Sequence, residues 1–190
     1  MERCPWPTTD LYCHYHDTEW GVPLHRDAKL FEFLLLEGAQ AGLSWLTVLN
    51  KREAYRQLFD GFDAEKIACY SDSKLEQLRT NPAIIRNRLK IESFRRNARA
   101  YLSLLESVDS FDSFIWQFVD HRVQQNSPVS MADVPVTTAE SDAMSKALKK
   151  RGFNFVGSTI CYAYMQATGM VNDHLTSCFR HRELMHHQQR

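Results

Sequence analysis

Two pairs of cysteine and histidine stand at opposite ends of this 190-residue chain. Cys4 and His16 lie near its start, whereas His174 and Cys178 lie near its finish. Thiolates and neutral imidazoles are the ligands that a structural zinc ion prefers, and two of each complete a tetrahedral site. If all four met on one ion, almost the whole chain would become a loop closed by the metal. The four-residue spacing of the second pair would place both side chains on one face of a helix.

The spacing of these residues leaves other interpretations open. Further candidate ligands are Cys13, His14, His181, His186 and His187. Unpaired cysteines are often small buried hydrophobes, and this interpretation also fits Cys4 and Cys178. It fits Cys161, which lies inside an apolar run, better still. The residue pattern is therefore compatible with a zinc site but does not establish one.

The composition is that of an ordinary globular protein, with 44% hydrophobic and 24% charged residues. A chain of this length forms one domain, or two small lobes that share a core. No stretch approaches the roughly 20 apolar residues of a membrane span, and the N-terminus lacks a signal-peptide pattern. We therefore expect no membrane partner and a reducing cytoplasm, in which the five cysteines are thiols or ligands rather than disulfides.

The 23 basic and 23 acidic residues balance, but they are unevenly placed along the chain. Basic residues cluster within 86–99 and again within 146–151, and an acidic segment at 106–133 lies between them. A nucleic-acid backbone responds to local potential, so this pattern is compatible with DNA or RNA binding. Solvated helix faces explain the same pattern equally well.

Apolar residues recur with the helical period along most of the chain. Phe94, Ala98, Tyr101, Leu102 and Leu105 form one stripe of a helix predicted over 87–107. Polar and turn residues predict further helix starts at or next to Asp27, Ser44, Asp63, Ser73, Asn81, Thr138 and Ser158. Residues 126–138 form the longest stretch without a predicted element. No alternation indicates strands, so the predicted class is all-α, built of many short helices.

A basic run precedes a glycine-containing turn between two of these predicted helices. Lys149, Lys150 and Arg151 lead into the turn, which ends at Phe155-Val156-Gly157 as in a helix-hairpin-helix element. Glycine in such a turn lets the backbone approach a phosphate, and N–H groups at the start of the next helix bind it. The basic side chains would add long-range attraction. An ordinary helical hairpin remains the alternative.

Glu37 follows the apolar run 33–36 and precedes the small residues of 38–42. A carboxylate is costly to bury without a partner or a purpose. Aromatic residues are available at Trp45 and, in the N-terminal segment, at Trp6, Tyr12, Tyr15 and Trp20. Aromatic faces attract cations and an acid accepts hydrogen bonds from an amine, so this set suits a flat cationic base. The alternative is that the rings belong to the core and Glu37 is a satisfied helix-terminal acid.

Five segments, at 1–4, 15–23, 36–45, 147–157 and 171–174, together resemble the 3-methyladenine DNA glycosylase I (Tag) family of bacterial repair enzymes. The resemblance covers residues 1–180, and we expect the His-rich tail at 181–190 to be disordered. It implies the helix-hairpin-helix DNA glycosylase fold, a single helical domain whose two lobes share a pocket. It also implies one structural Zn2+ per chain, which joins the N- and C-terminal segments.

The resemblance assigns roles to individual residues. The implied zinc ligands are Cys4, His16, His174 and Cys178. The implied base-specificity and catalytic acid is Glu37, and the implied base-binding rings are Tyr12, Tyr15 and Trp45, with Trp6 and Trp20 nearby. The implied DNA contacts are Gly42, Leu43 and Ser44, which enter the DNA where the flipped nucleotide was, and Lys149, Lys150, Arg151, Phe155 and Gly157.

The implied activity is hydrolysis of the N-glycosidic bond of 3-methyladenine in alkylated double-stranded DNA, by base flipping and leaving an abasic site. We expect a monomeric, monofunctional enzyme, because no lysine is placed for Schiff-base chemistry. The wider superfamily carries a catalytic aspartate where this chain has Asn172, and Asp173 lies one residue later. A cationic base is already a good leaving group, which would allow catalysis without that aspartate. The alternative function is a non-catalytic, zinc-stabilised DNA-damage-binding protein.

Overall fold

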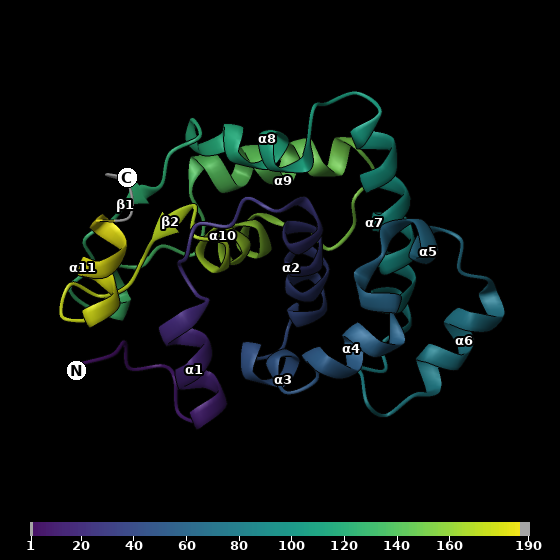
Figure 1. The fold of residues 1–190 in the computed structure, drawn as a ribbon, viewed down its shortest axis with the longest axis horizontal. Coiled ribbons are helices and arrows are strands. Elements are labelled where there is room, and N and C mark those ends of the chain that lie inside the picture. The colour runs from purple at the N-terminus through teal and green to yellow at the C-terminus, as the bar shows by residue number, and fades with distance from the viewer. Residues whose placement is uncertain (1, 187–190) are drawn as a thin grey trace.

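The computed structural model describes residues 2–186 and shows a mostly helical chain (Figure 1). The α-helices are α1 (Asp10–Thr18), α2 (Asp27–Gln40), α3 (Trp45–Leu49), α4 (Arg52–Leu58), α5 (Ala64–Ala68), α6 (Asp72–Thr80), α7 (Arg88–Leu105), α8 (Phe111–Trp116), α9 (Ala139–Lys150), α10 (Ser158–Ala167) and α11 (Phe179–His186). Short 3-10 turns lie at Asp60–Phe62, Gln117–Val119 and Met131–Asp133. The predicted helical class is thus confirmed. Among residues 2–186, no helix combines the length and apolarity needed to cross a membrane.

One small sheet departs from the predicted all-α class. Strands β1 (Gln124–Gln125) and β2 (Val171–Asn172) pair in parallel, with Gln124 opposite Val171. Two residues are too few to show the alternation by which strands are recognised in a sequence. The pair matters because β2 leads directly into the segment that carries His174 and Cys178.

Polar caps set several helix starts as predicted. The side chains of Ser44, Asp63 and Thr138 each accept a hydrogen bond from a backbone N–H three residues later, at the start of α3, α5 and α9. Asn87 does the same for α7, whose predicted stripe is largely buried in the core. These local signals therefore place most of the helices.

Three predicted helix starts are wrong or displaced. Asn81 ends α6 rather than beginning a helix, and α6 is capped by Ser71 instead of Ser73. Asp27 is the first residue of α2 and does not cap it. Its carboxylate accepts hydrogen bonds from the N–H groups of Phe111 and Asp112, at 2.9 and 2.8 Å, at the start of α8. Such a cap depends on tertiary structure, which local pattern does not reveal.

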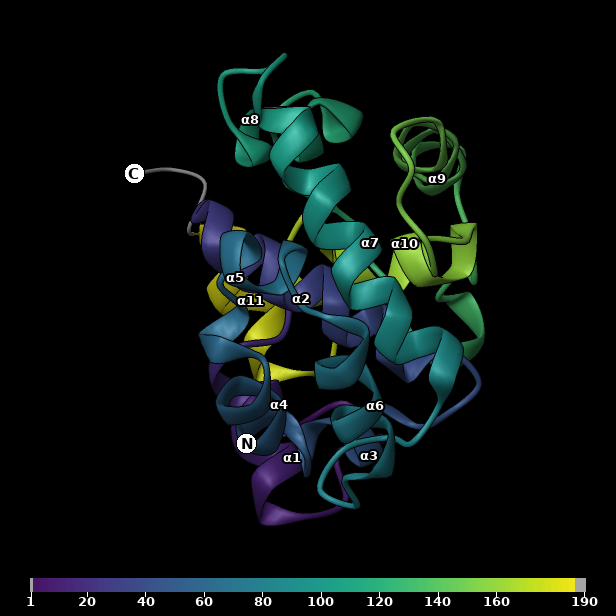
Figure 2. The same cartoon turned by 90° about the vertical axis from the view of Figure 1, so that its right-hand side faces the viewer.

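Helix α2 forms the centre of the molecule and contacts α3, α7, α8 and α10 (Figures 1 and 2). Ten of its fourteen residues are buried, so it is surrounded by protein on nearly all sides. Two of the ten are acids. Glu32 is paired with Lys29 and Arg56, each at 2.6 Å, whereas Glu37 has no ion-pair partner among the described residues. The fold therefore carries an unpaired carboxyl group into the interior.

The last helix corrects the prediction of a disordered tail beginning at residue 181. Residues 181–186 complete α11, in which His181 and Leu184 are buried. The His181 side chain donates from Nε2 to the carbonyl oxygen of Asn126 at 2.8 Å. These contacts hold the segment against the fold. Residues 187–190, including the candidate ligand His187, lie outside the described residues, as does the side chain of His186. The division of residues 1–180 into two lobes stays a prediction.

Candidate active site and metal centre

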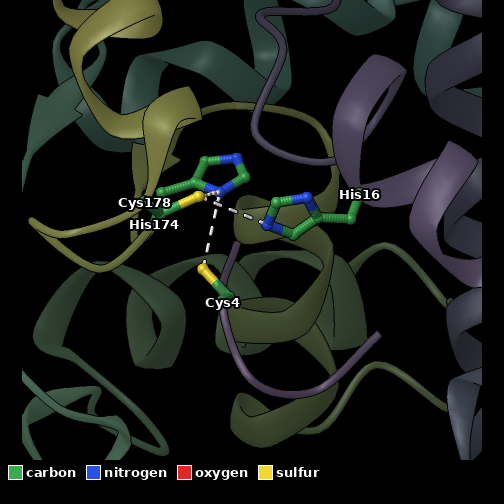
Figure 3. Close-up of side chains that lie close together, drawn as sticks. All are labelled: Cys4, His16, His174 and Cys178. Atoms are coloured by element: carbon green, nitrogen blue, oxygen red, sulfur yellow. Dashed lines mark hydrogen bonds between the residues drawn. The ribbon is translucent and has the colours of Figure 1, made fainter. Parts of the chain in front are cut away.

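The four predicted metal ligands converge from both ends of the chain (Figure 3). The ligand atoms of Cys4, His16, His174 and Cys178 all lie within 4.8 Å of one another, and all four residues are buried. Sγ of Cys178 lies 3.5 Å from Nε2 of His16 and 3.6 Å from Nδ1 of His174. This group could hold a metal ion. Two thiols and two imidazoles would fill a tetrahedral site and leave no open coordination position.

The predicted helical placement of His174 and Cys178 is wrong. Residues 173–178 form turns between β2 and α11, and the Cys178 N–H donates to the Leu175 carbonyl at 2.8 Å. The Leu175 N–H is in turn free to donate to Sγ of Cys4 at 3.4 Å. The turn therefore brings the pair together and also supplies a donor to a third ligand.

Neighbouring acceptors orient both imidazole rings toward the thiols. His16 contacts Oδ1 of Asp17 through Nδ1 at 2.7 Å, and His174 donates from Nε2 to the Trp20 carbonyl at 3.1 Å. Asp17 is itself paired with Arg3 at 2.9 Å. These contacts direct Nε2 of His16 and Nδ1 of His174 inward, as metal ligation requires.

The pKa values of the two neighbouring thiols are shifted in opposite directions. Their mutual hydrogen bond lowers the pKa of Cys178, and hydrogen bonds from His16 and His174 lower it further. The same bond raises the pKa of Cys4, and burial raises it further. A lowered pKa favours the thiolate of Cys178, which is the form of cysteine that binds a metal.

All five predicted base-binding rings line one cavity of about 300 Å3. They are Trp6, Tyr12, Tyr15, Trp20 and Trp45. The ring of Trp6 lies 5.0 Å from that of His16, and the ring of Trp20 lies 4.6 Å from that of His174, between centroids. The group formed by Cys4, His16, His174 and Cys178 thus lies directly behind one wall of the cavity.

Glu37 lies in the same cavity, as predicted, and is 2% exposed. Burial raises the pKa of its carboxyl group to about 8. Its Oε2 atom and the indole Nε1 of Trp45 are both buried without a hydrogen-bond partner among the described residues. Buried polar groups normally have partners, so one acceptor and one donor in one aromatic cavity indicate a ligand that carries the complementary groups.

The cavity also contains residues that the sequence reasoning missed. The polar ones are Gln40, Thr159, Tyr162 and Gln166, and the apolar ones are Met131, Val134, Pro135, Val136 and Ala163. Helical spacing could have indicated some of them, because Gln40 lies one turn beyond Glu37 and Tyr162 one turn before Gln166. The segment at 131–136 has no such signal.

Of the two adjacent candidates Asn172 and Asp173, only Asp173 lines the cavity. It accepts hydrogen bonds from Tyr162 at 2.6 Å, Gln166 at 2.8 Å and Asn126 at 2.6 Å. Asn172 is fully buried, and its amide donates instead to the Gln125 side chain and the His181 carbonyl. The residue aligned with the superfamily aspartate therefore has a structural position, while its neighbour lies at the site.

The loop between α2 and α3 contains the three residues predicted to enter DNA. Gly42 has a positive φ of 75°, Leu43 is 42% exposed, and Ser44 caps α3. Lys90 holds the base of this loop, because its buried ammonium group donates to the carbonyls of Ala39 and Ala41 at 2.8 and 2.6 Å. An exposed leucine is thus presented on a well-anchored turn.

Residues 151–157, which we call the hairpin, connect α9 to α10. The side chain of Asn97 in α7 forms two hydrogen bonds with the hairpin backbone. Its amide nitrogen donates to the Asn154 carbonyl at 3.0 Å, and its oxygen accepts from the Asn154 N–H at 2.7 Å. Gly157 immediately precedes α10 and has no side chain to cap it, which leaves backbone N–H groups available at the start of the helix.

The five predicted DNA contacts in and beside the hairpin differ in accessibility. Lys149 and Lys150 are exposed at the end of α9. Arg151 contacts Ser107 at 2.6 Å and lies over the Phe114 ring. Phe155 packs against Gly38. The DNA contacts of these residues stay predictions.

Comparison with known proteins agrees with this geometry. A model of the methyladenine glycosylase family matches residues 6–181. DNA-3-methyladenine glycosylase 1 of Escherichia coli (strain K12) is 52% identical over 179 residues, which cover 94% of this chain and 96% of that protein. The DNA-3-methyladenine glycosylase of Haemophilus influenzae is 49% identical over 177 residues, which cover 93% and 96%.

Solved structures show the same likeness. A crystal structure of 3-methyladenine DNA glycosylase I has a TM-score of 0.92 to this chain at 52% identity, covering 94% of this chain and 98% of that one. A structure concerning 3-methyladenine recognition by the Staphylococcus aureus enzyme has a TM-score of 0.91 at 34% identity, covering 94% and 96%. The likeness spans nearly the whole chain in sequence and in fold, and the chain belongs to the methyladenine glycosylase family.

Proposed function

We propose that this chain removes 3-methyladenine from alkylated double-stranded DNA by hydrolysing its N-glycosidic bond, which leaves an abasic site. The observation that carries the proposal is the unpartnered Glu37 carboxyl group inside a cavity walled by aromatic rings. Relatives that are about half identical along the whole chain are named for this activity. A base can reach such a cavity only after it leaves the helical stack.

The cavity is suited to a flat cationic ring. Methylation at the 3-position gives adenine in DNA a positive charge, and the faces of Trp45 and Tyr15 attract such a charge. Their ring centroids lie 5.4 Å apart on one wall. Glu37 accepts a hydrogen bond from the exocyclic amine of this base. Burial raises the pKa of Tyr15 well above its ordinary value, so its phenol remains a donor.

The protonation of Glu37 adds selectivity for a charged base. With a pKa of about 8, its carboxyl group is mostly neutral near pH 7 when no cation lies beside it. A cationic base favours the carboxylate, and Glu37 releases its proton as the base enters. Undamaged adenine is neutral and gives no such stabilisation. The cavity therefore favours the base that is also the better leaving group.

The reaction requires one water molecule and no covalent intermediate. The glycosidic bond breaks with its electron pair passing to the cationic base, which leaves as neutral 3-methyladenine. The water oxygen bonds to the sugar carbon, and its proton passes to solvent. Asp173 is the second carboxyl group at the cavity and is the candidate for stabilising positive charge on the sugar. No lysine is among the residues that line the described cavity, which favours a monofunctional enzyme.

We further propose that Cys4, His16, His174 and Cys178 bind one structural zinc ion. The ligand types, their mutual distances and their burial fit this ion. Bound zinc would supply a covalent-like crosslink between the chain ends and no activated water. Through the contacts of Trp6 and Trp20 with the two imidazoles, the crosslink would hold one wall of the base cavity in place.

The test is release of free 3-methyladenine from methylated duplex DNA. Wild-type protein should release it, and Glu37→Gln should lower kcat/KM on the order of a hundred-fold through loss of one charged hydrogen bond. Glu53→Gln is the control, since Glu53 is an exposed acid outside the cavity. Binding to methylated DNA with no base released by the wild type would instead establish the damage-binding alternative.

A further inference from the structure

Exposed apolar side chains are concentrated beside the base cavity. Val129, Met131 and Val136 are 75%, 44% and 69% exposed, and they make up three of the seven large hydrophobic residues that are exposed in the described chain. With Val134 and Pro135 they form what we call the apolar rim. Large apolar side chains gathered on one surface segment commonly mark a contact with a partner.

The rim is anchored at both ends and internally. The Pro128 carbonyl accepts from the Thr176 N–H at 2.9 Å, next to the metal-ligand turn. Thr138 caps α9 at the far end. Between them, the Asp133 carboxylate accepts from the N–H groups of Val129 and Ser130, at 3.1 and 2.8 Å. The exposed side chains are therefore presented by a built turn.

The rim is continuous with the base cavity. Met131, Val134, Pro135 and Val136 line the same cavity as Glu37 and Trp45. A base in the cavity remains attached to its sugar and strand until the bond breaks. The sugar and the flanking nucleosides must therefore lie at the cavity mouth, where the rim is exposed.

The charge of the rim indicates which part of DNA it fits. Residues 127–137 contain no lysine or arginine and one acid, Asp133, whose carboxylate is used by the turn itself. The rim has no cation for a phosphate. Apolar side chains that contact DNA do so against sugars and base edges, as in proteins that insert apolar wedges into the minor groove.

We infer that the apolar rim contacts the sugar of the extruded nucleotide and the adjoining base edges of duplex DNA, as a second contact beside the Gly42–Ser44 loop. The inference rests on the proposed function, and it assigns to this segment a partner that the base cavity alone does not require. The contribution is apolar, so it is independent of salt, unlike that of Lys149 and Lys150.

The experiment compares two ligands that differ in whether they carry a backbone. One is free 3-methyladenine, and the other is a duplex with a tetrahydrofuran abasic analogue, which has the sugar and no base. Met131→Ser with Val136→Ser should weaken duplex binding roughly ten-fold, as expected for loss of one buried apolar side chain or more. Binding of free 3-methyladenine should fall by a clearly smaller factor, because the free base meets Met131 and Val136 only as part of the cavity lining. Met185→Ser is the matched control for Met131→Ser, because Met185 is 45% exposed and lies outside the cavity.

Three results would overturn the inference. One is unchanged duplex binding in the double variant with its melting temperature intact. Another is an equal loss of affinity for the free base, which would make the rim a wall for the base only. The third is a reduced slope of log affinity against log salt, the change expected of Lys149→Ala. Failure of the wild type to release 3-methyladenine would overturn the proposed function instead, and the duplex measurement would still decide the rim contact.

Discussion

Gly38 and Phe155 pack against each other with no side chain between their backbones. A Cβ atom on Gly38 would lie 3.2 Å from Cβ of Phe155 and 3.5 Å from its carbonyl oxygen. Phe155 has a positive φ of 55°, which is uncommon for a residue other than glycine. Glu37 immediately precedes Gly38. The helix that carries the acid proposed to recognise the base is therefore in direct contact with the hairpin proposed to hold DNA.

This contact predicts the effect of Gly38→Ala. The added methyl group would lie closer to Phe155 than an ordinary contact, so the hairpin would have to shift by a few tenths of an ångström. Overpacking costs about 1–3 kcal/mol, and we expect it to outweigh the roughly 1 kcal/mol by which alanine is favoured over glycine inside a helix. That cost lowers the melting temperature by roughly 2–4 °C per kcal/mol for a chain of this size. We expect kcat/KM on methylated DNA to fall several-fold as well. A variant with wild-type melting temperature and activity would show that the hairpin and α2 are not coupled through this contact.

Gly157→Ala should separate DNA contact from stability. A Cβ atom at Gly157 would meet no protein atom within 4 Å, and its φ of −65° is one that alanine readily adopts. The melting temperature should therefore change by less than the effect of Gly38→Ala. If the N-terminus of α10 approaches a phosphate, the methyl group would obstruct that approach and weaken duplex binding several-fold. Unchanged duplex affinity would place the phosphate elsewhere.

The helices were predictable because their signals are local. Ser44, Asp63 and Thr138 cap helices through hydrogen bonds to the backbone three residues later. The apolar stripe of α7 likewise lies within one continuous segment of the sequence. The prediction that Asp27 caps α2 is wrong because its carboxylate instead accepts hydrogen bonds at the start of α8, over 80 residues later. Local sequence patterns reflect contacts between residues that are close in the sequence. A cap supplied by a distant residue produces no such pattern.

The candidate site was predictable to the extent that it depends on unusual residue types. A carboxyl group after an apolar run, tryptophans and cysteine–histidine pairs are conspicuous, and Glu37, Trp45 and Cys178 lie where the resemblance implied. The wall at Met131–Val136 was not predictable, because valine, proline and methionine carry no chemical signature outside their tertiary context. The choice between Asn172 and Asp173 likewise required the structure, since adjacent residues point in different directions.

Cys178→Ser should remove metal and destabilise the fold together. Loss of the Cys178 thiolate would leave only three ligands for the ion, which are the buried Cys4, His16 and His174. A loss of about 3 kcal/mol would lower the melting temperature by roughly 10 °C, and the release of a structural zinc can cost more. Zinc content per chain and melting temperature are the measurements. Cys69→Ser is the control, since Cys69 is exposed and lies outside the group. Unchanged zinc content and stability in Cys178→Ser would refute the crosslink.

Glu37→Gln should stabilise the protein at alkaline pH while impairing its activity. Burial holds the pKa of Glu37 at about 8, against an ordinary value of 4.5. The folded state therefore binds this proton more tightly than the unfolded state. Below pH 4.5 the carboxyl group is protonated in both the folded and the unfolded state, so its ionisation does not change the free energy of unfolding. Between pH 4.5 and 8 it ionises first in the unfolded chain, so the wild type loses stability as the pH rises.

Glutamine cannot ionise and avoids this loss. The gain in free energy of unfolding of Glu37→Gln over the wild type should be largest above pH 8, where it amounts to several kcal/mol. It should shrink toward zero near pH 4.5. Urea midpoints of both proteins at pH 5 and pH 8 measure it, with Glu53→Gln as the exposed control. An advantage of equal size at both pH values would mean that Glu37 does not titrate in this range. A stabilising variant that has lost base release would show that the acid is kept for recognition of the cationic base, at the expense of the fold.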